Sequence, residues 1–165
     1  MKPEEILSYE PKVLSQEQRE FYFENGYLQL ESFVDQDWLD RLWSVTNRLI
    51  EESRNFSKSD QVFDLEPNHT AEAPRLRRIS QPVGLDPVFE DFGLRGPIVD
   101  LAEDLVGPNV KFHHSKLNMK WASGGEEVQW HQDIQFWPHT NYSPLTIGLY
   151  MDDVDDEMGP MGVFP

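Results

Sequence analysis

The spacing of apolar and polar residues predicts that the N-terminal part of the chain is mainly helical. A short helix is predicted from Ser15 to Asn25, because Ser15 can cap its N-terminus and Gln18 stands at the capping-box position. Gly26 follows as a C-terminal stop. We expect Phe21 to be the main core anchor of this helix.

A longer amphipathic helix is predicted after a short strand at residues 27–30. Asp35 or Asp37 can cap this helix, which runs to about Ser53. Its large apolar residues recur at i, i+4, i+7 and i+11 and form one stripe suited to packing on a sheet. They are Trp38, Leu42, Val45 and Leu49. A third helix is predicted over residues 97–106 and ends at the Gly-Pro-Asn that follows.

From Val110 onward the pattern changes to the alternation expected of β-strands. Residues 54–75, by contrast, are polar and irregular, as is typical of a loop or lid. We therefore predict one domain over residues 1–165 that is mainly β with N-terminal helices. In it, residues 1–109 form a helical part with short strands, and residues 110–165 form the first strands of a β-core.

Composition restricts the possible functions. The chain has 165 residues, enough for one core, and no Cys, which excludes disulfides and thiolate metal sites. Its net charge of −16 repels phosphate backbones and weakly disfavours acyl-CoA substrates, so we expect no nucleic-acid partner. We also expect a cytoplasmic protein, because neither a signal peptide nor a membrane-spanning apolar run is evident.

The stretch from Trp130 to Asp133 is the most informative motif. In a strand, side chains at i and i+2 point to the same face, so His131 and Asp133 can direct a ring nitrogen and a carboxylate oxygen at one ion. This pair is two-thirds of the 2-His-1-carboxylate ligand set of non-haem Fe(II) oxygenases. Aromatic residues around the pair could form an apolar wall or plain core. They are Trp130, Phe136 and Trp137.

Polar residues also share one face of the preceding predicted strand. They are His114, Lys116, Asn118 and Lys120. If this strand pairs with the strand of His131, cationic and amide groups lie beside the metal, as an acidic co-substrate requires. A solvated outer face of a sheet is the simpler interpretation. Because His113 and His114 are adjacent, they would point to opposite faces of the strand and could not share an ion.

Two further candidate metal sites have less support in the sequence. His139 lies after His131, but Pro138 interrupts the strand between them, so His139 is a poor third ligand. The acidic residues 152–157 lack the spacing of an EF-hand loop and its turn glycine, and a solvated turn explains them better.

Four blocks of the sequence resemble the phytanoyl-CoA dioxygenase family, which includes ectoine hydroxylase. The stretch from His131 to Pro138 is similar to the family's metal-binding segment, and residues 107–120 are similar to the strand before it. Residues 15–28 resemble the helix-then-strand start of the family. Residues 159–165 resemble the segment just before the family's Gly-Ser/Thr-His. The blocks occur in the family's order and span nearly the whole chain.

This resemblance implies a partial double-stranded β-helix, or jelly roll, that uses Fe(II), 2-oxoglutarate and O₂ to hydroxylate a small organic substrate. His131 and Asp133 are then iron ligands, and His114 and Trp137 lie on the substrate side. The implied co-substrate residues are Lys120, Asn118, Lys116 and Arg78. Ectoine-type enzymes have a glutamine where His114 stands, which argues against ectoine as the substrate.

In the resembling family, the distal histidine and the arginine that anchors 2-oxoglutarate lie downstream of the segment similar to residues 159–165. We therefore expect the chain to be the N-terminal part of a longer enzyme or a truncated product, poorly stable and inactive alone. Two alternatives stay open. One is a non-catalytic acidic interaction protein with a degenerate jelly roll. The other is a β-helix metalloenzyme with a different reaction, although a halogenase would lack the carboxylate of Asp133.

Overall fold

The computed structural model describes residues 1–122, 128–136, 141 and 143–164, which divide into two units. The first unit consists of Met1–Phe33, Arg95–Phe112 and Trp130–Pro165. The second unit consists of Val34–Leu94 and His113–Gln129. Each unit has its own core and is described separately below.

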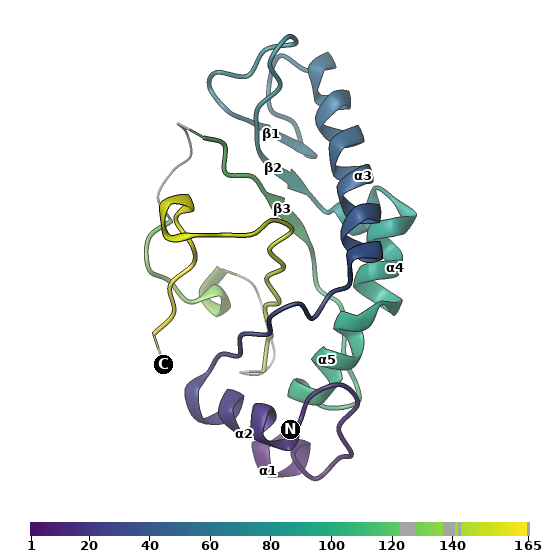
Figure 1. The fold of residues 1–165 in the computed structure, drawn as a ribbon, viewed down its shortest axis with the longest axis vertical. Helices are drawn as coiled ribbons and strands as arrows, with labels where there is room; N and C mark the ends of the chain where they lie inside the picture. Colours follow the sequence, from purple (N-terminus) through teal and green to yellow (C-terminus); the bar gives the residue numbers. More distant parts are fainter. Residues whose placement is uncertain (123–127, 137–140, 142, 165) are drawn as a thin grey trace. The chain divides into compact units, whose positions relative to one another are not determined.

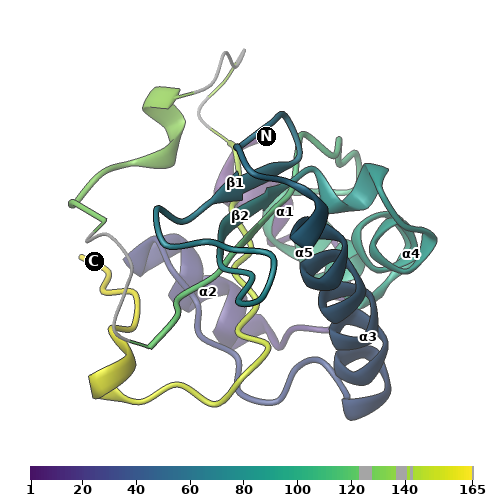
Figure 2. The same ribbon diagram turned by 90° about the horizontal axis from the view of Figure 1, so that it is seen from above.

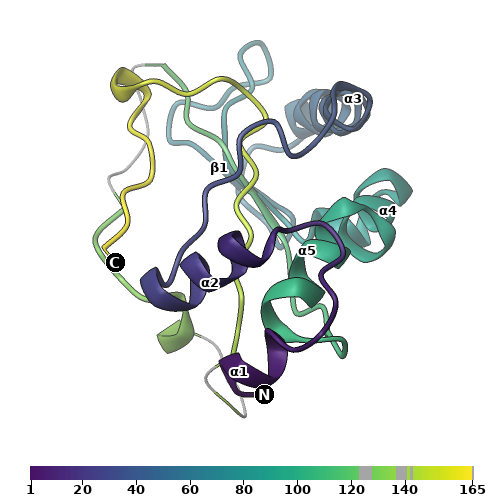
Figure 3. The same cartoon turned by 60° about the horizontal axis from the view of Figure 1, so that its bottom comes forward.

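The α-helices of the first unit are α1 (Pro3–Ile6), α2 (Gln16–Asn25) and α5 (Pro97–Val106) (Figure 3). Helix α2 has the predicted capping box, in which Ser15 Oγ accepts from the Gln18 N–H and the Gln18 side chain accepts from the Ser15 N–H. It ends at Gly26, whose φ of 79° is a left-handed conformation that favours glycine. Helix α5 also has its predicted bounds.

Arg19, and not Phe21, is the buried residue of α2. Arg19 is 1% exposed, whereas Phe21 is 40% exposed, so the prediction that Phe21 anchors this helix is wrong. The Arg19 guanidinium donates hydrogen bonds to the backbone carbonyl oxygens of Ile6, Tyr9 and Asp104. This side of α2 therefore packs on polar backbone groups, which require a donor and not an aromatic ring.

Asp104 of α5 is the buried acidic counterpart of Arg19. Its carboxylate accepts hydrogen bonds of 2.8–2.9 Å from three successive backbone N–H groups, those of Lys12, Val13 and Leu14. The adjoining hydrophobic cluster contains Leu14, Leu101 and Leu105. Arg19 and Asp104 thus bind the segment before α2 to both helices and satisfy its buried backbone groups.

The second unit packs helices α3 (Gln36–Glu52) and α4 (Pro87–Arg95) with a small sheet (Figures 1 and 2). Of the two predicted capping residues, Asp35 is the one that caps α3. Its side chain accepts a hydrogen bond from the Trp38 N–H. Within the predicted stripe, Leu42, Val45 and Leu49 are buried. Trp38 is only partly buried and contacts Phe92 of α4 edge-on, with ring centroids 5.4 Å apart.

The sheet is antiparallel, with the strand order β1 (Phe63–Leu65), β2 (Leu76–Ser80) and β3 (Lys116–Asn118). Ile79 pairs with Phe63 on one side and Leu117 on the other, and both Phe63 and Ile79 are buried. Short 3-10 helices complete the described secondary structure. They are η1 (Ser53–Asn55), η2 (Pro82–Gly84), η3 (Asp133–Phe136) and η4 (Asp156–Met158).

Several predicted elements differ in the structure. Residues 27–30 form no strand, and the predicted loop over residues 54–75 contains β1 and most of a hairpin that leads into β2. Neither β2 nor α4 was predicted. The long strand expected from Val110 is limited to β3, because only those residues find a partner strand in β2.

The predicted combination of N-terminal helices and β-structure is present, but the described residues contain only one small three-stranded antiparallel sheet and are not clearly mainly β. The described residues from 128 to 164 include no strand and no buried side chain. Trp130 and Phe164, for example, are 68% and 79% exposed. A strand requires a neighbour to satisfy its backbone groups, and the described part of this segment pairs with none.

Candidate metal centre

His131 and Asp133 direct their side chains at each other within the first unit. The distance from His131 Nε2 to Asp133 Oδ1 is 3.2 Å, and the two side chains are 33% and 30% exposed. The predicted strand is absent, because Asp133 begins the 3-10 helix η3. The two side chains nevertheless lie within hydrogen-bond distance of each other.

This arrangement fits a transition-metal ion. Two ligand atoms about 2.1 Å from one ion and at right angles to each other are about 3 Å apart. An imidazole nitrogen and a carboxylate oxygen are suitable ligands for Fe(II). Without a metal, a hydrogen bond between His131 and Asp133 accounts for the same distance. Among the described residues, no three His, Cys, Asp or Glu side chains are placed to share an ion, so no third ligand is identified there.

Thr146 orients the carboxylate of Asp133. Its hydroxyl donates a 2.7 Å hydrogen bond to Oδ2, the oxygen that does not face His131. The Phe136 ring lies edge-on to the His131 ring, with centroids 5.4 Å apart. Sequence reasoning missed Thr146, because no motif spacing connects it to Asp133. The predicted substrate residue Trp137 lies outside the described residues, as does His139.

Three predicted co-substrate residues come together in the sheet of the second unit. Arg78 of β2 is the direct partner of Asn118 of β3, and Lys116 is the partner of Ser80. All three of the predicted residues are exposed, and Lys120, which follows β3, is exposed as well. Arg78 and Asn118 are far apart in the sequence, and the structure makes them neighbours.

The side chains of His113 and His114 are adjacent in space, contrary to the prediction. Their Nδ1 atoms are 2.7 Å apart, and their rings meet edge-on with centroids 4.9 Å apart. The expectation that they point to opposite faces is wrong because β3 begins only at Lys116. Before that residue, strand alternation does not apply.

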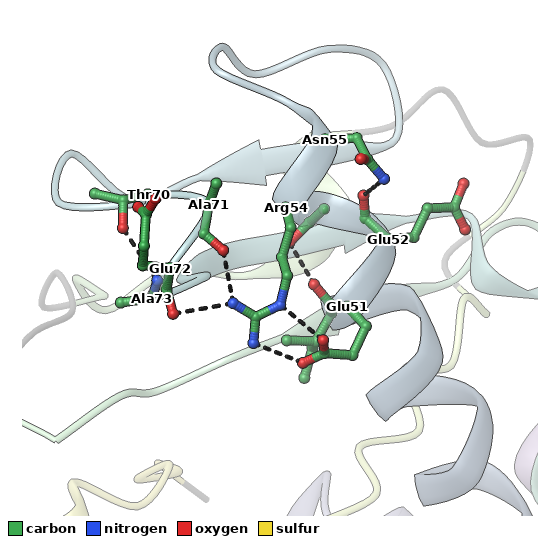
Figure 4. A network of polar contacts seen from close by, with 10 residues as sticks. Glu51, Glu52, Arg54, Asn55, Thr70, Ala71, Glu72 and Ala73 are labelled. Carbon is green, nitrogen blue, oxygen red and sulfur yellow. Dashed lines mark hydrogen bonds and ion pairs between the residues drawn. The ribbon is translucent and has the colours of Figure 1, made fainter.

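Arg54 fixes the hairpin that joins β1 to β2 (Figure 4). Its guanidinium donates to the carbonyl oxygens of Ala71 and Glu72 at 2.6 and 3.0 Å. It also makes a bidentate contact with Glu51 at 2.7 and 2.9 Å. The hydrogen bonds from Arg54 lower the pKa of the Glu51 carboxyl group, and the same contact raises the pKa of Arg54.

Comparison with known proteins identifies the family. The profile of the phytanoyl-CoA dioxygenase (PhyH) family matches residues 22–165. The chain belongs to the phytanoyl-CoA dioxygenase family. The resemblance inferred from the four sequence blocks is thereby confirmed. Within the described residues of this family member, no helix is both long and apolar enough to cross a membrane.

The chain is similar in sequence to several curated dioxygenases and hydroxylases. A probable alpha-ketoglutarate-dependent hypophosphite dioxygenase of Stutzerimonas stutzeri is 29% identical over 93% of this chain and 53% of its own length. An ectoine dioxygenase of Bordetella parapertussis is 24% identical over 93% of this chain and 49% of its own length. An L-proline trans-4-hydroxylase of Streptomyces griseoviridis is 42% identical over 41% of this chain and 27% of its own length. The chain thus spans about half the length of the first two.

Proposed function

We propose that the full-length protein is a cytoplasmic Fe(II)/2-oxoglutarate-dependent dioxygenase that hydroxylates a small organic substrate. The observation that carries this proposal is the 3.2 Å approach of His131 Nε2 to Asp133 Oδ1 in a chain of this family. The chain spans about half the length of the relatives it matches. We further propose that the other half of such a protein supplies the remaining strands of a jelly roll.

His131 and Asp133 would hold Fe(II), and Thr146 keeps one carboxylate oxygen of Asp133 occupied so that the other faces the ion. The bound iron, with 2-oxoglutarate and O₂, would supply the oxidising power for C–H hydroxylation. The residues of this chain bind and orient these reactants. The hydroxyl of Thr146 fixes the carboxylate rotamer in the way that outer partners of metal ligands usually do.

We propose that four polar residues on and next to the sheet bind the co-substrate. 2-Oxoglutarate is a dianion, and the net charge of −16 repels it unless cations are concentrated locally. Arg78, Lys116 and Asn118 lie on paired strands, and Lys120 follows them, so this sheet offers three cations and one amide. Charge-assisted hydrogen bonds from such groups are the strong interactions that hold a carboxylate.

The substrate would be small, and His114 and Trp137 are proposed to contact it. Named substrates of similar proteins include hypophosphite, L-proline and ectoine. Although the family name refers to an acyl-CoA, the high negative charge of this chain disfavours so anionic a substrate. A panel of small acids and amino acids is therefore the appropriate first screen.

Titration calorimetry under anaerobic conditions tests the metal site. We expect Fe(II) or Mn(II) to bind the wild-type protein, and we expect H131A and D133A to abolish that binding. D152N, in the exposed acidic run, is the matched control and should bind metal normally. 2-Oxoglutarate should bind only the metal-loaded form. Metal binding that persists in both H131A and D133A would reject the site and favour the non-catalytic alternative.

A further inference from the structure

The residues just after β3 stay hydrogen-bonded to β2, first through the backbone and then through a side chain. The Met119 N–H donates a backbone hydrogen bond of 3.0 Å to the Arg77 carbonyl oxygen. Two residues later, the indole Nε1–H of Trp121 donates a 2.7 Å hydrogen bond to the carbonyl oxygen of Leu76. Lys120 therefore lies between two residues that are both anchored to β2.

Arg75 provides a third anchor on the same stretch. One of its guanidinium nitrogens, Nη1, donates a 3.3 Å hydrogen bond to the carbonyl oxygen of Ala122. The centre of the guanidinium lies 5.8 Å from the centroid of the Trp121 ring, within the range of a cation–π interaction. The backbone that carries Lys120 is thus held on one side by a backbone hydrogen bond and on the other by side-chain contacts.

The hairpin in turn fixes Arg75. The Arg75 N–H donates to His69 Nδ1 at 2.9 Å, and the Arg75 carbonyl oxygen accepts from the Glu66 N–H at 3.0 Å. Arg54 binds the tip of the same hairpin, as described above (Figure 4). These contacts form a continuous path from α3 through the hairpin to the residue next to Lys120.

We propose that Trp121 and Arg75 are positioning residues that hold Lys120 for the carboxylate of the co-substrate. This inference rests on the proposed function, in which Lys120 binds 2-oxoglutarate. A lysine side chain is long and flexible, and immobilising it on binding costs affinity. Fixing the backbone on both sides removes the additional cost of ordering the backbone, so that only the side-chain torsions of Lys120 are ordered on binding. The hairpin between β1 and β2 would then govern affinity for the co-substrate rather than the binding of the metal.

Two substitutions test the positioning role in the full-length, metal-loaded protein. W121F keeps an aromatic ring but removes the hydrogen bond to Leu76, and R75Q removes the cation over the ring. We expect each to raise the calorimetric Kd for 2-oxoglutarate about three- to tenfold, a coupling typical of residues in contact. The affinity for Mn(II) should not change. R41Q is the matched control, since Arg41 stacks on Trp38 of α3 at 4.1 Å, and it should leave both affinities unchanged.

A double-mutant cycle with K120A distinguishes positioning from a general structural effect. If Trp121 and Arg75 act through Lys120, then W121F and R75Q should have no further effect on the Kd in the K120A background. Thermal unfolding identifies a variant that fails to fold. If W121F does so, R75Q carries the test, because Arg75 is partly exposed.

Failure of this inference differs from failure of the proposed function. If K120A alone leaves the affinity for 2-oxoglutarate unchanged, the assignment of Lys120 to the co-substrate is wrong. If K120A weakens binding but W121F and R75Q have no effect, the positioning role is overturned. The positioning role is also overturned if W121F and R75Q raise the Kd for 2-oxoglutarate as much in the K120A background as in the wild type.

Discussion

Two parts of the first unit contrast sharply in how their polar and apolar groups are satisfied. Around α2 and α5, the buried Arg19 and Asp104 occupy six backbone groups between them, and leucines pack nearby. From residue 130 to 164, the described side chains are never buried, and large apolar groups face solvent. Helices complete their hydrogen bonds locally, whereas strands need a partner, so the helical region buries its side chains and the described part of the second region, which has no strand, does not.

The largest expected effect comes from breaking the buried polar centre. R19M should lower the free energy of unfolding by about 3–5 kcal/mol, because it leaves the carbonyl oxygens of Ile6, Tyr9 and Asp104 without their hydrogen-bond donor. E24A on the same helix is the control and should cost less than about 1 kcal/mol, since Glu24 is exposed. Urea unfolding measures both. If both variants lost the same free energy of unfolding, the buried hydrogen bonds of Arg19 would not be a special source of stability in this region.

A smaller loss is expected at the ends of α2. G26A places a side chain at a φ of 79°, and S15A removes the capping hydroxyl. Each should cost about 1 kcal/mol in the same unfolding measurement. E24A, at an exposed position of the same helix, should cost only a few tenths of a kcal/mol. If the cap variants matched E24A, the local signals in this helix would contribute nothing to its stability.

A modest pH effect is expected at the hairpin, which is also built from local contacts. The pKa of Glu51 lies below its usual value of 4.5 because Arg54 donates to the charged form. The stabilisation is therefore present above pH 4.5 and lost as the pH falls through the lowered pKa. The N–H groups of Thr70 and Ala73 are hydrogen-bonded within the hairpin tip. Their protection factors, which are exchange rates measured by NMR and corrected for the intrinsic effect of pH, should fall on acidification. E51Q should remove this pH dependence, and an unchanged acid profile in E51Q would contradict the assignment.

The smallest effect is expected in the exposed segment. W130S and F164S should change the free energy of unfolding of the 165-residue chain by no more than about 0.5 kcal/mol, because both rings already face solvent. The same substitutions in the full-length protein should destabilise it measurably if partner strands cover this surface. A large loss in the 165-residue chain would show that the segment is packed and would remove the contrast between the two regions.

The sequence predicted the elements whose signals are local. The bounds of α2, α3 and α5 follow from caps and stops at Ser15, Asp35 and Gly107 that act within a turn of the helix. The strand β2 depends on pairing with residues distant in sequence, and no local pattern specified it. Arg19 was overlooked for a similar reason, since its carbonyl partners belong to other segments.

The candidate site was predictable in part. The approach of His131 to Asp133 occurs even though no strand forms, because residues two apart in an extended or turn-like chain can still bring their side chains together. The pairing of Arg78 with Asn118 and the bond from Thr146 to Asp133 both join distant parts of the sequence. Such contacts follow from the folded topology and not from spacing.

The recognition of the hairpin tip by Arg54 has an evolutionary consequence. Arg54 makes its hydrogen bonds to the backbone carbonyl oxygens of Ala71 and Glu72, whose side chains are exposed. The charge of Glu72 adds only a favourable electrostatic contribution at Arg54. Mutations at these two codons can therefore accumulate without removing the hydrogen bonds that hold the loop. A lineage could explore new surface chemistry at the tip while its backbone, and the path from it to Lys120, stays in place.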